Sequence, residues 1–340
     1  MLRHFIYEER LFSLELLNHR ISSFDYGYGN EKNKPSVILN LRTSDNAIKQ
    51  TASQMWCLLQ VLTFLVGDLV SVGSEHWHLF ILLRQICSIV FAPVVTYGLA
   101  VFLKQLIIEH HTQFKKLYDR NLIPKHHFMT HYPRMMVMFG PISQLWCMRF
   151  EAKHKPLKRH TNIVGNFKNV SKTLSYKHQV QQMYSFKLGD PFSEKMIVTN
   201  SYPVTIGSLK KADVVLENLK SAKDFEYTLN CAVYVTHAVS VFGQTYRTGS
   251  VMPLKADDKG EPLFGEIIHI IPQTDDMSIL MFVRILTVKY FDDHFYAYVV
   301  HQTKEYEMIS LADTADFRPL DIMQGFDTDE LYLNPRYKIV

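Results

Sequence analysis

Cysteine is scarce in this sequence. Its four cysteines lie far apart, and no two of them form a Cys-x-x-Cys motif: Cys57, Cys87, Cys147 and Cys231. Such spacing provides no disulfide framework and no zinc-binding motif that is complete in itself. A reducing compartment is therefore the simpler interpretation.

Glycine and proline are also few, with 14 and 13 among 340 residues. Hydrophobic residues make up 47% of the chain and charged residues 21%. Because disorder requires low hydrophobicity, this composition predicts that most of the chain folds. The length allows two or three domains of roughly 150 residues each.

A long apolar run without interruption is missing as well. The first residues, MLRHFIYEER, carry charges where a signal peptide needs an apolar core. Residues 85–103 are uncharged and about long enough to span a bilayer, but Pro93 in their middle should break a helix. We therefore predict two buried helices that meet near Pro93 and no membrane contact. A membrane protein built on 85–103 is the weaker alternative.

Charge is distributed unevenly along the chain. Residues 257–330 hold 16 acids and 5 bases, a net charge of −11, so the remainder carries about +15. Residues 149–178 hold eight Lys or Arg against one acid. A basic stripe of this density favours a polyanionic partner. The alternative is a solvated helix face.

Helical periodicity dominates the first half of the chain. It extends over about 47–131, with Thr51 or Ser53 as a candidate cap and a long helix expected over 94–118. Further helices are expected around 146–155 and over 166–183. The turn-forming residues of 185–205 then predict a linker.

The pattern becomes strand-like after residue 230. Apolar and smaller or polar residues alternate over 233–241, and β-rich runs follow at short spacing. This spacing predicts a small β-barrel-like, SH3-like module. Its aromatic residues either line a recognition groove or fill the core: Phe242, Tyr246, Phe264, Tyr290, Phe291, Phe295, Tyr296 and Tyr298. Because the module is acidic, it is a better candidate for protein contacts than for nucleic acid.

Three short motifs follow one another between residues 125 and 154. They are KHHFMTHYP, FGP and WCMRFEAKH. Together they resemble the C-terminal part of DDE-type transposases of the CACTA (En/Spm) group and, more distantly, the catalytic core of the vertebrate antigen-receptor recombinase. The resemblance covers about residues 1–185, and its specific part is this stretch.

The resemblance implies an RNase H-like core in which three carboxylates hold two divalent metals, Mg²⁺ or Mn²⁺. Glu151 would be the third carboxylate, on a late helix that follows a large helical insertion. Two metals of this kind clamp the attacking and leaving oxygens of a phosphodiester. From the residues alone, Glu151 is equally an ordinary surface glutamate paired with Lys155 at i+4.

The same resemblance implies a histidine half of a zinc site, formed by His131 with His126 or His127. His127 and His131 are four apart and share a helix face, whereas His126 and His131 would need a helix end or bend to converge. Zinc needs four ligands, usually with a Cys pair, and the sequence has no such pair. Core or surface histidines are the alternative.

The first two carboxylates of the family are not visible in the sequence. Asp25, Asp45 and Asp68 are the only aspartates before Asp119, and none ends a convincing apolar strand. We therefore expect a chain that is catalytically incomplete by itself, whether as a fragment, a remnant or a domesticated protein.

The sequence thus predicts an α+β chain: a helical, insertion-like region with a partial RNase H-like remnant (1–185), a linker (186–205) and a β-rich module (206–340). We expect a nuclear, transposase-derived DNA-binding protein. Its candidate DNA-binding side chains are Arg149, Lys153, Lys155, Lys158, Arg159, Lys168 and Lys172. The rival interpretation is a non-enzymatic protein-interaction scaffold.

Overall fold

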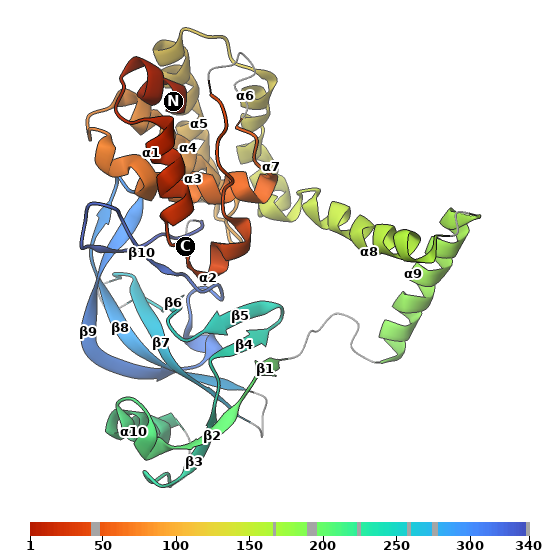
Figure 1. The fold of residues 1–340 in the computed structure, drawn as a ribbon, viewed down its shortest axis with the longest axis vertical. Helices are drawn as coiled ribbons and strands as arrows, with labels where there is room; N and C mark the ends of the chain where they lie inside the picture. Colours follow the sequence, from red (N-terminus) through yellow and green to blue (C-terminus); the bar gives the residue numbers. More distant parts are fainter. Residues whose placement is uncertain are drawn as a thin grey trace.

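The computed structural model describes residues 1–41, 48–165, 168–188, 196–222, 226–256, 260–273 and 278–337, with the backbone alone at 148–150 and 153. The fold is a mixed α+β arrangement with 47% helix and 22% strand. Helices form one end of the molecule and sheets the other, and two helices, α8 and α9, project sideways as an arm (Figure 1).

The helices of the first half follow one another with short connections. In chain order they are η1 (His4–Glu8), α1 (Leu14–Ser23), α2 (Gly27–Asn30), η2 (Glu31–Asn33), α3 (Ala52–Val66), η3 (Gly67–Leu69), α4 (Glu75–Val90), α5 (Tyr97–Tyr118), α6 (Pro124–Met129), α7 (Tyr132–Phe139), η4 (Ile142–Gln144), α8 (Met148–Val164) and α9 (Val170–Lys187).

Side-chain caps fix where the three long core helices begin. Thr51 forms a capping box with Gln54 at the start of α3, and it is one of the two caps that the sequence predicted. Ser74 and Thr96 accept the third backbone N–H of α4 and α5 in the same way. Each cap satisfies a backbone donor that the first helical turn leaves without a partner.

The uncharged stretch 85–103 is divided between two helices, as predicted. Helix α4 ends at Val90 and α5 begins at Tyr97, so Pro93 lies in the connection between them. By length and composition alone, one other helical stretch could cross a membrane: Ala52–Leu69, of which 56% is buried inside the protein.

The described residues of the second half form eleven strands and one further α-helix. They are β1 (Ile197–Thr199), β2 (Tyr202–Thr205), η5 (Ile206–Ser208), α10 (Ala212–Ala222), β3 (Ala232–Val235), β4 (Ala238–Val241), β5 (Gln244–Arg247), β6 (Val251–Pro253), β7 (Leu263–Pro272), β8 (Ile279–Asp292), β9 (Ala297–Ile309), η6 (Leu311–Asp313), β10 (Ile322–Gln324) and β11 (Leu331–Leu333).

All strand pairs are antiparallel, and they form three sheets. The largest has the order β10-β11-β9-β8-β7-β6, and the smaller sheets are β1-β4-β5 and β2-β3. Isolated bridges join Val251 to Leu320 and Leu254 to Thr314 beside the edge strand β6. Over the described residues, however, no continuous ladder closes the sheet, so the expected β-barrel is not found. The long β8–β9 hairpin makes the main sheet wide and open, which the spacing of strand-like runs in the sequence did not reveal.

The helical and β parts share one hydrophobic core. Leu17 and Phe64 from the helices pack in the same cluster as Tyr296, Val299 and Tyr332 from the sheet. The β region also has buried clusters of its own between its sheets and around α10. The predicted linker region contains β1 and β2, whose partners are β4 and β3.

Candidate functional site

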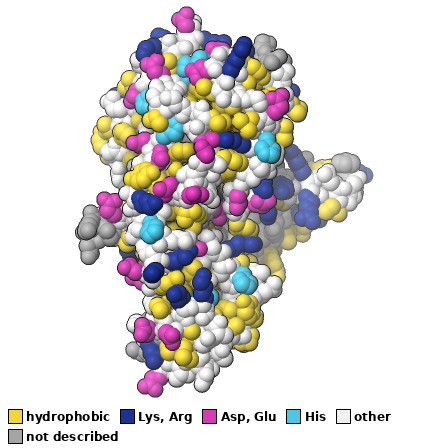
Figure 2. Space-filling model, turned by 60° about the vertical axis from the view of Figure 1, so that its left-hand side comes forward, with side chains coloured by type: hydrophobic (Ala, Val, Ile, Leu, Met, Phe, Trp, Pro, Cys, Tyr) yellow, Lys and Arg dark blue, Asp and Glu magenta, His cyan; other side chains and the backbone are white. Residues whose placement is uncertain are grey.

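The arm formed by α8 and α9 carries the basic stripe that the sequence indicates. No residue of α9 is buried, and none of the described side chains of α8 is buried either. Gly165 ends α8 in the left-handed conformation, at φ 60°, which glycine adopts without strain. Figure 2 shows Lys and Arg side chains gathered on this arm, at the right of the view.

Three cations of α8 lie on one face of the helix. Lys155, Lys158 and Arg159 are exposed, and their spacing of three and four residues places them side by side. Glu151 precedes them by one turn on the same face.

Glu151 lies in the first turn of α8 and is exposed. A carboxylate there is favoured by the positive end of the helix dipole. Over the described residues, its carboxylate forms no hydrogen bond or ion pair with Lys155 or another side chain, and it belongs to no group of three metal-ligating side chains. The described residues therefore do not fit a two-metal Mg²⁺ or Mn²⁺ site by themselves.

Helix α9 adds further exposed cations. Lys168 lies just before the helix, and Lys172, Lys177 and Lys187 lie along it. The Lys177 ammonium lies 3.4 Å from Nδ1 of His160 on α8, a contact that links the two helices of the arm. The side chains of Arg149 and Lys153, two of the predicted DNA-binding residues, lie outside the described part of the structure.

An open hollow of about 450 Å³ lies along α8. It is lined by Lys155 and Arg159 together with Ala152, Pro156, His160 and Ile163. Pro156 has no backbone N–H to donate inside the helix. The two cations make the lining positively charged, which favours an anionic group.

The three predicted zinc histidines do not come together. The Nε2 atoms of His127 and His131 lie 3.2 Å apart on the exposed side of α6 and the start of α7. His126 points elsewhere: its Nδ1 accepts the Ile123 N–H, and its ring packs on Phe114. Only the pair that shares a helix face converges, and two histidines alone do not complete a four-ligand zinc site.

Two of the four cysteines are poorly suited to supply the missing zinc ligands. Cys57 is buried in the core, and burial raises the pKa of its thiol to about 12. Burial likewise raises the pKa of the Cys87 thiol to about 11. A thiol binds zinc as the thiolate, so these two residues are poor ligands.

Sequence reasoning missed two further histidines beside His126. His110 and His111 of α5 are buried, with His110 Nδ1 and His111 Nε2 lacking a hydrogen-bond partner among the described residues. The rings of both contact that of His126. The adjacent pair within a periodic helix was the available signal, because a polar pair on the buried face of such a helix is unusual.

We expect acid to destabilise the protein through His110. Burial, and then His111 and His126, lower its pKa from 6.5 to about 4. The unfolded chain therefore binds a proton between pH 6.5 and 4 that the folded chain rejects, so stability falls as pH falls through this window. Urea denaturation should show a loss of about 2 kcal/mol between pH 7 and 5 from this residue. In His110→Gln this loss of stability between pH 7 and 5 should be absent. If the variant shows the same dependence of unfolding free energy on pH as the unmodified chain, His110 is not its source.

Most aromatic residues of the β region fill the core and do not line a groove. Phe264 and Tyr246 are buried, whereas Phe242 and Tyr290 are exposed on different strands or turns. Some acidic side chains form ion pairs with cations of the same region: Glu330 pairs with Lys289, and Glu266 pairs with Arg284. A protein partner for this acidic region stays a prediction.

No protein-family model matches the chain, and no curated protein matches its sequence. A function for the chain is therefore inferred from its own residues and their arrangement.

Proposed function

We propose that this chain binds duplex DNA through the α8–α9 arm. The observation that carries the proposal is the arm itself: residues 148–188 hold nine Lys or Arg and one acid, and none of the side chains described on its two helices is buried. Helices that stabilise a core bury an apolar face, and the described side chains of this arm form none. Its positive charge is suited to the phosphates of a nucleic acid, which supply most of the non-specific binding free energy.

We further propose that the chain derives from a DDE-type transposase of the CACTA group and acts in the nucleus. The motifs that resemble this family fall on α6, α7 and the first turns of α8, and Glu151 would be the equivalent of the last carboxylate. In this proposal, the helical region retains a remnant of an RNase H-like fold, and that remnant ends in α8. A complete metal site would need two carboxylates from elsewhere, so strand cleavage is not an activity of this chain alone.

The histidine half of a zinc site is proposed at His127 and His131. Both nitrogens face each other on an exposed surface, where ligands from another chain or segment could complete the coordination. His126 is excluded from this pair by its contact with Ile123 and Phe114.

Binding should weaken steeply with salt, because each phosphate contact releases condensed counterions. If four or five side chains of the arm touch phosphate, the slope of log K against log salt is about −4 on duplex DNA. Little sequence preference is expected, since phosphate contacts position a protein without reading bases. Fluorescence anisotropy with two unrelated labelled duplexes, at three or more salt concentrations, measures both quantities.

Glu151→Ala is the control for the role of the lone carboxylate. This substitution should leave the affinity for duplex DNA unchanged or raise it slightly, because it removes a negative charge from the cationic face of α8. If the unmodified chain shows no binding at low salt, the DNA-binding proposal fails and the protein-interaction scaffold takes its place.

A further inference from the structure

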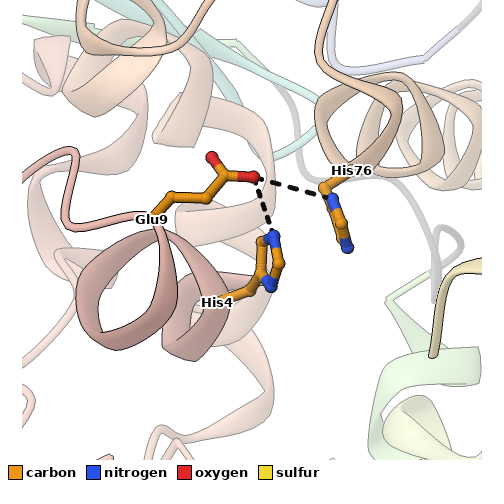
Figure 3. Close-up of side chains that lie close together, drawn as sticks. All are labelled: His4, Glu9 and His76. Atoms are coloured by element: carbon orange, nitrogen blue, oxygen red, sulfur yellow. Dashed lines mark hydrogen bonds and ion pairs between the residues drawn. The ribbon is translucent and has the colours of Figure 1, made fainter.

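Three side chains that bind transition metals meet at the opposite end of the helical region from the arm. His4 belongs to η1, Glu9 follows it, and His76 lies in the first turn of α4. Their ligand atoms all lie within 4.8 Å of one another. The carboxylate of Glu9 is directed at both imidazole rings (Figure 3), with Oε1 at 2.7 Å from Nε2 of His4 and 3.9 Å from Nδ1 of His76.

The unusual winding of the first helix brings two of these residues together. Residues His4–Glu8 form a π-helix, and the Glu9 N–H donates to the carbonyl of His4 five residues earlier. The wider turn brings residues five apart closer to the same side than an ordinary α-helix does. π-turns are rare and frequently occur at functional sites.

The third residue is positioned by a helix cap. Ser74 accepts the backbone N–H of Trp77 and so fixes the first turn of α4, to which His76 belongs. The Trp77 side chain is buried and donates from Nε1 to the carbonyl of His294 at 3.0 Å. His76 is therefore held by a rigid part of the core, and η1 brings the other two ligands to it.

A second carboxylate orients the His4 ring. Nδ1 of His4 lies 2.7 Å from Oε2 of Glu8, which is four residues away on the same turn. Metal-binding histidines usually donate their other ring N–H to a carboxylate or carbonyl in this way. With Nδ1–H donated to Glu8, Nε2 of His4 is the ring nitrogen that faces Glu9, and a metal would take the place of the proton between them.

The two imidazole rings are stacked, with centroids 3.7 Å apart and planes 25° from parallel. The His76 ring also makes an edge contact with the ring of Tyr118, with centroids 5.4 Å apart. These two ring contacts hold His76 beside His4.

We propose that His4, Glu9 and His76 form a binding site for a divalent transition metal, of which Zn²⁺ is the best match. Two imidazole nitrogens and one carboxylate oxygen suit zinc and its neighbours, whereas Mg²⁺ and Ca²⁺ prefer oxygen ligands. Metal–ligand bonds of about 2.0–2.2 Å place tetrahedral ligand atoms roughly 3.3 Å apart. The two distances to Glu9, 2.7 and 3.9 Å, lie on either side of this value. The third separation, between the ring nitrogens of His4 and His76, is at most 4.8 Å. Because the two rings are stacked, metal binding requires them to rotate until both nitrogens point at one ion.

The fourth coordination position has room for a water molecule or a small ligand. His4, Glu8 and His76 line a cavity of about 450 Å³ whose other walls are mostly apolar side chains of α3, α4 and α5. Three protein ligands with an open fourth position are typical of zinc sites that bind an exchangeable ligand. The site is remote from the basic arm and does not depend on DNA binding.

Zinc binding by the full chain tests this proposal. The exposed His127–His131 pair could bind metal too, so the measurement uses a His127→Ala, His131→Ala background. Isothermal titration with Zn²⁺ should show one site per chain, and Co²⁺ in its place should give the visible absorption bands of a low-coordinate complex. Mg²⁺ should not compete at millimolar concentration.

Single substitutions then identify the ligands. Replacement of His76 or His4 by alanine should weaken zinc binding at least 100-fold, and Glu8→Gln should weaken it about tenfold because it removes the orienting carboxylate. The matched control is His78→Ala, which removes an exposed histidine two residues along α4. Among the described residues its ring pairs with Glu109, at 3.4 Å, and the zinc affinity of this variant should be unchanged. His76→Cys should restore binding and add a near-ultraviolet thiolate-to-cobalt band, which shows that loss in the alanine variant was not caused by misfolding.

Two results would overturn the proposal. One is the absence of stoichiometric Zn²⁺ binding in the background variant with native circular dichroism. The other is an affinity that stays the same in His4→Ala and His76→Ala.

Discussion

Replacing Lys155, Lys158, Arg159 and Lys172 by alanine is expected to reduce duplex affinity at 0.1 M salt by about 10³-fold. At that salt concentration each counterion released contributes about one order of magnitude to the binding constant. The salt slope should accordingly fall from about −4 towards zero. Anisotropy titrations of the unmodified chain and the variant, with the same duplex, provide both values.

A second variant with the same change in net charge separates contact from overall charge. Lys32, Lys104, Lys115 and Lys125 are exposed lysines on other helices and loops. Replacing these four by alanine lowers the net charge equally but leaves the arm intact, so affinity should fall less than tenfold. Equal losses in the two variants would mean that binding follows net charge, and the arm would then have no particular role.

The other large effect is expected in the core, where Asn334→Ala should destabilise the protein by about 3–5 kcal/mol. Arg84 is fully buried, and its Nη2 donates to Oδ1 of Asn334 at 2.7 Å and to the Pro335 carbonyl at 3.2 Å. Its guanidinium also lies over the ring of Tyr296, at 5.3 Å from the centroid. Removing the asparagine leaves a buried charge without its main hydrogen-bond acceptor, which is among the most destabilising changes in a core.

Replacing the charged residue, Arg84, should destabilise the protein less than Asn334→Ala does. Arg84→Met keeps much of the buried volume and leaves no cation to solvate, so we expect a loss of about 1–2 kcal/mol. The double variant should be more stable than Asn334→Ala alone, since no orphaned charge remains. Urea denaturation followed by tryptophan fluorescence and circular dichroism measures all three, with the exposed Asn121→Ala as control. A cost below 1 kcal/mol for Asn334→Ala would show that water or another group solvates Arg84.

The same experiment tests how the two halves of the chain cooperate. Arg84 lies on α4 and Asn334 follows β11, 250 positions away, and Nδ2 of Asn334 donates to the Gln60 carbonyl on α3 at 2.8 Å. Loss of this network should therefore weaken the helical and β regions together. Separate transitions by the two probes would instead indicate domains that unfold independently.

The sequence could predict features that depend on neighbouring residues. The break between α4 and α5 follows from the conformational limits of Pro93, and the cap at Thr51 follows from its position before an apolar helix. The placement of Lys155, Lys158 and Arg159 on one face follows from helical spacing alone. The exposure of Glu151 on a helix could be predicted for the same reason.

The sequence could not predict which histidines meet. His127 and His131 are one turn apart and converge, whereas His126 turns towards His110 and His111 on a different helix. The β region shows the same limit: short spacing between runs suggested a barrel, but the lengths and bulges of β7, β8 and β9 produce an open sheet. Both outcomes depend on packing between segments that are distant in the chain.

By itself, then, the sequence determined the mixed α+β class, the helix break near Pro93 and a basic segment of two helices, because backbone conformation and charge are local properties. Only the tertiary structure decided that this segment stands free of the core, that Arg84 depends on Asn334, and that His76 lies beside His4 and Glu9. Such contacts are set by how apolar faces pack to leave water, and packing joins residues without regard to their separation in the chain.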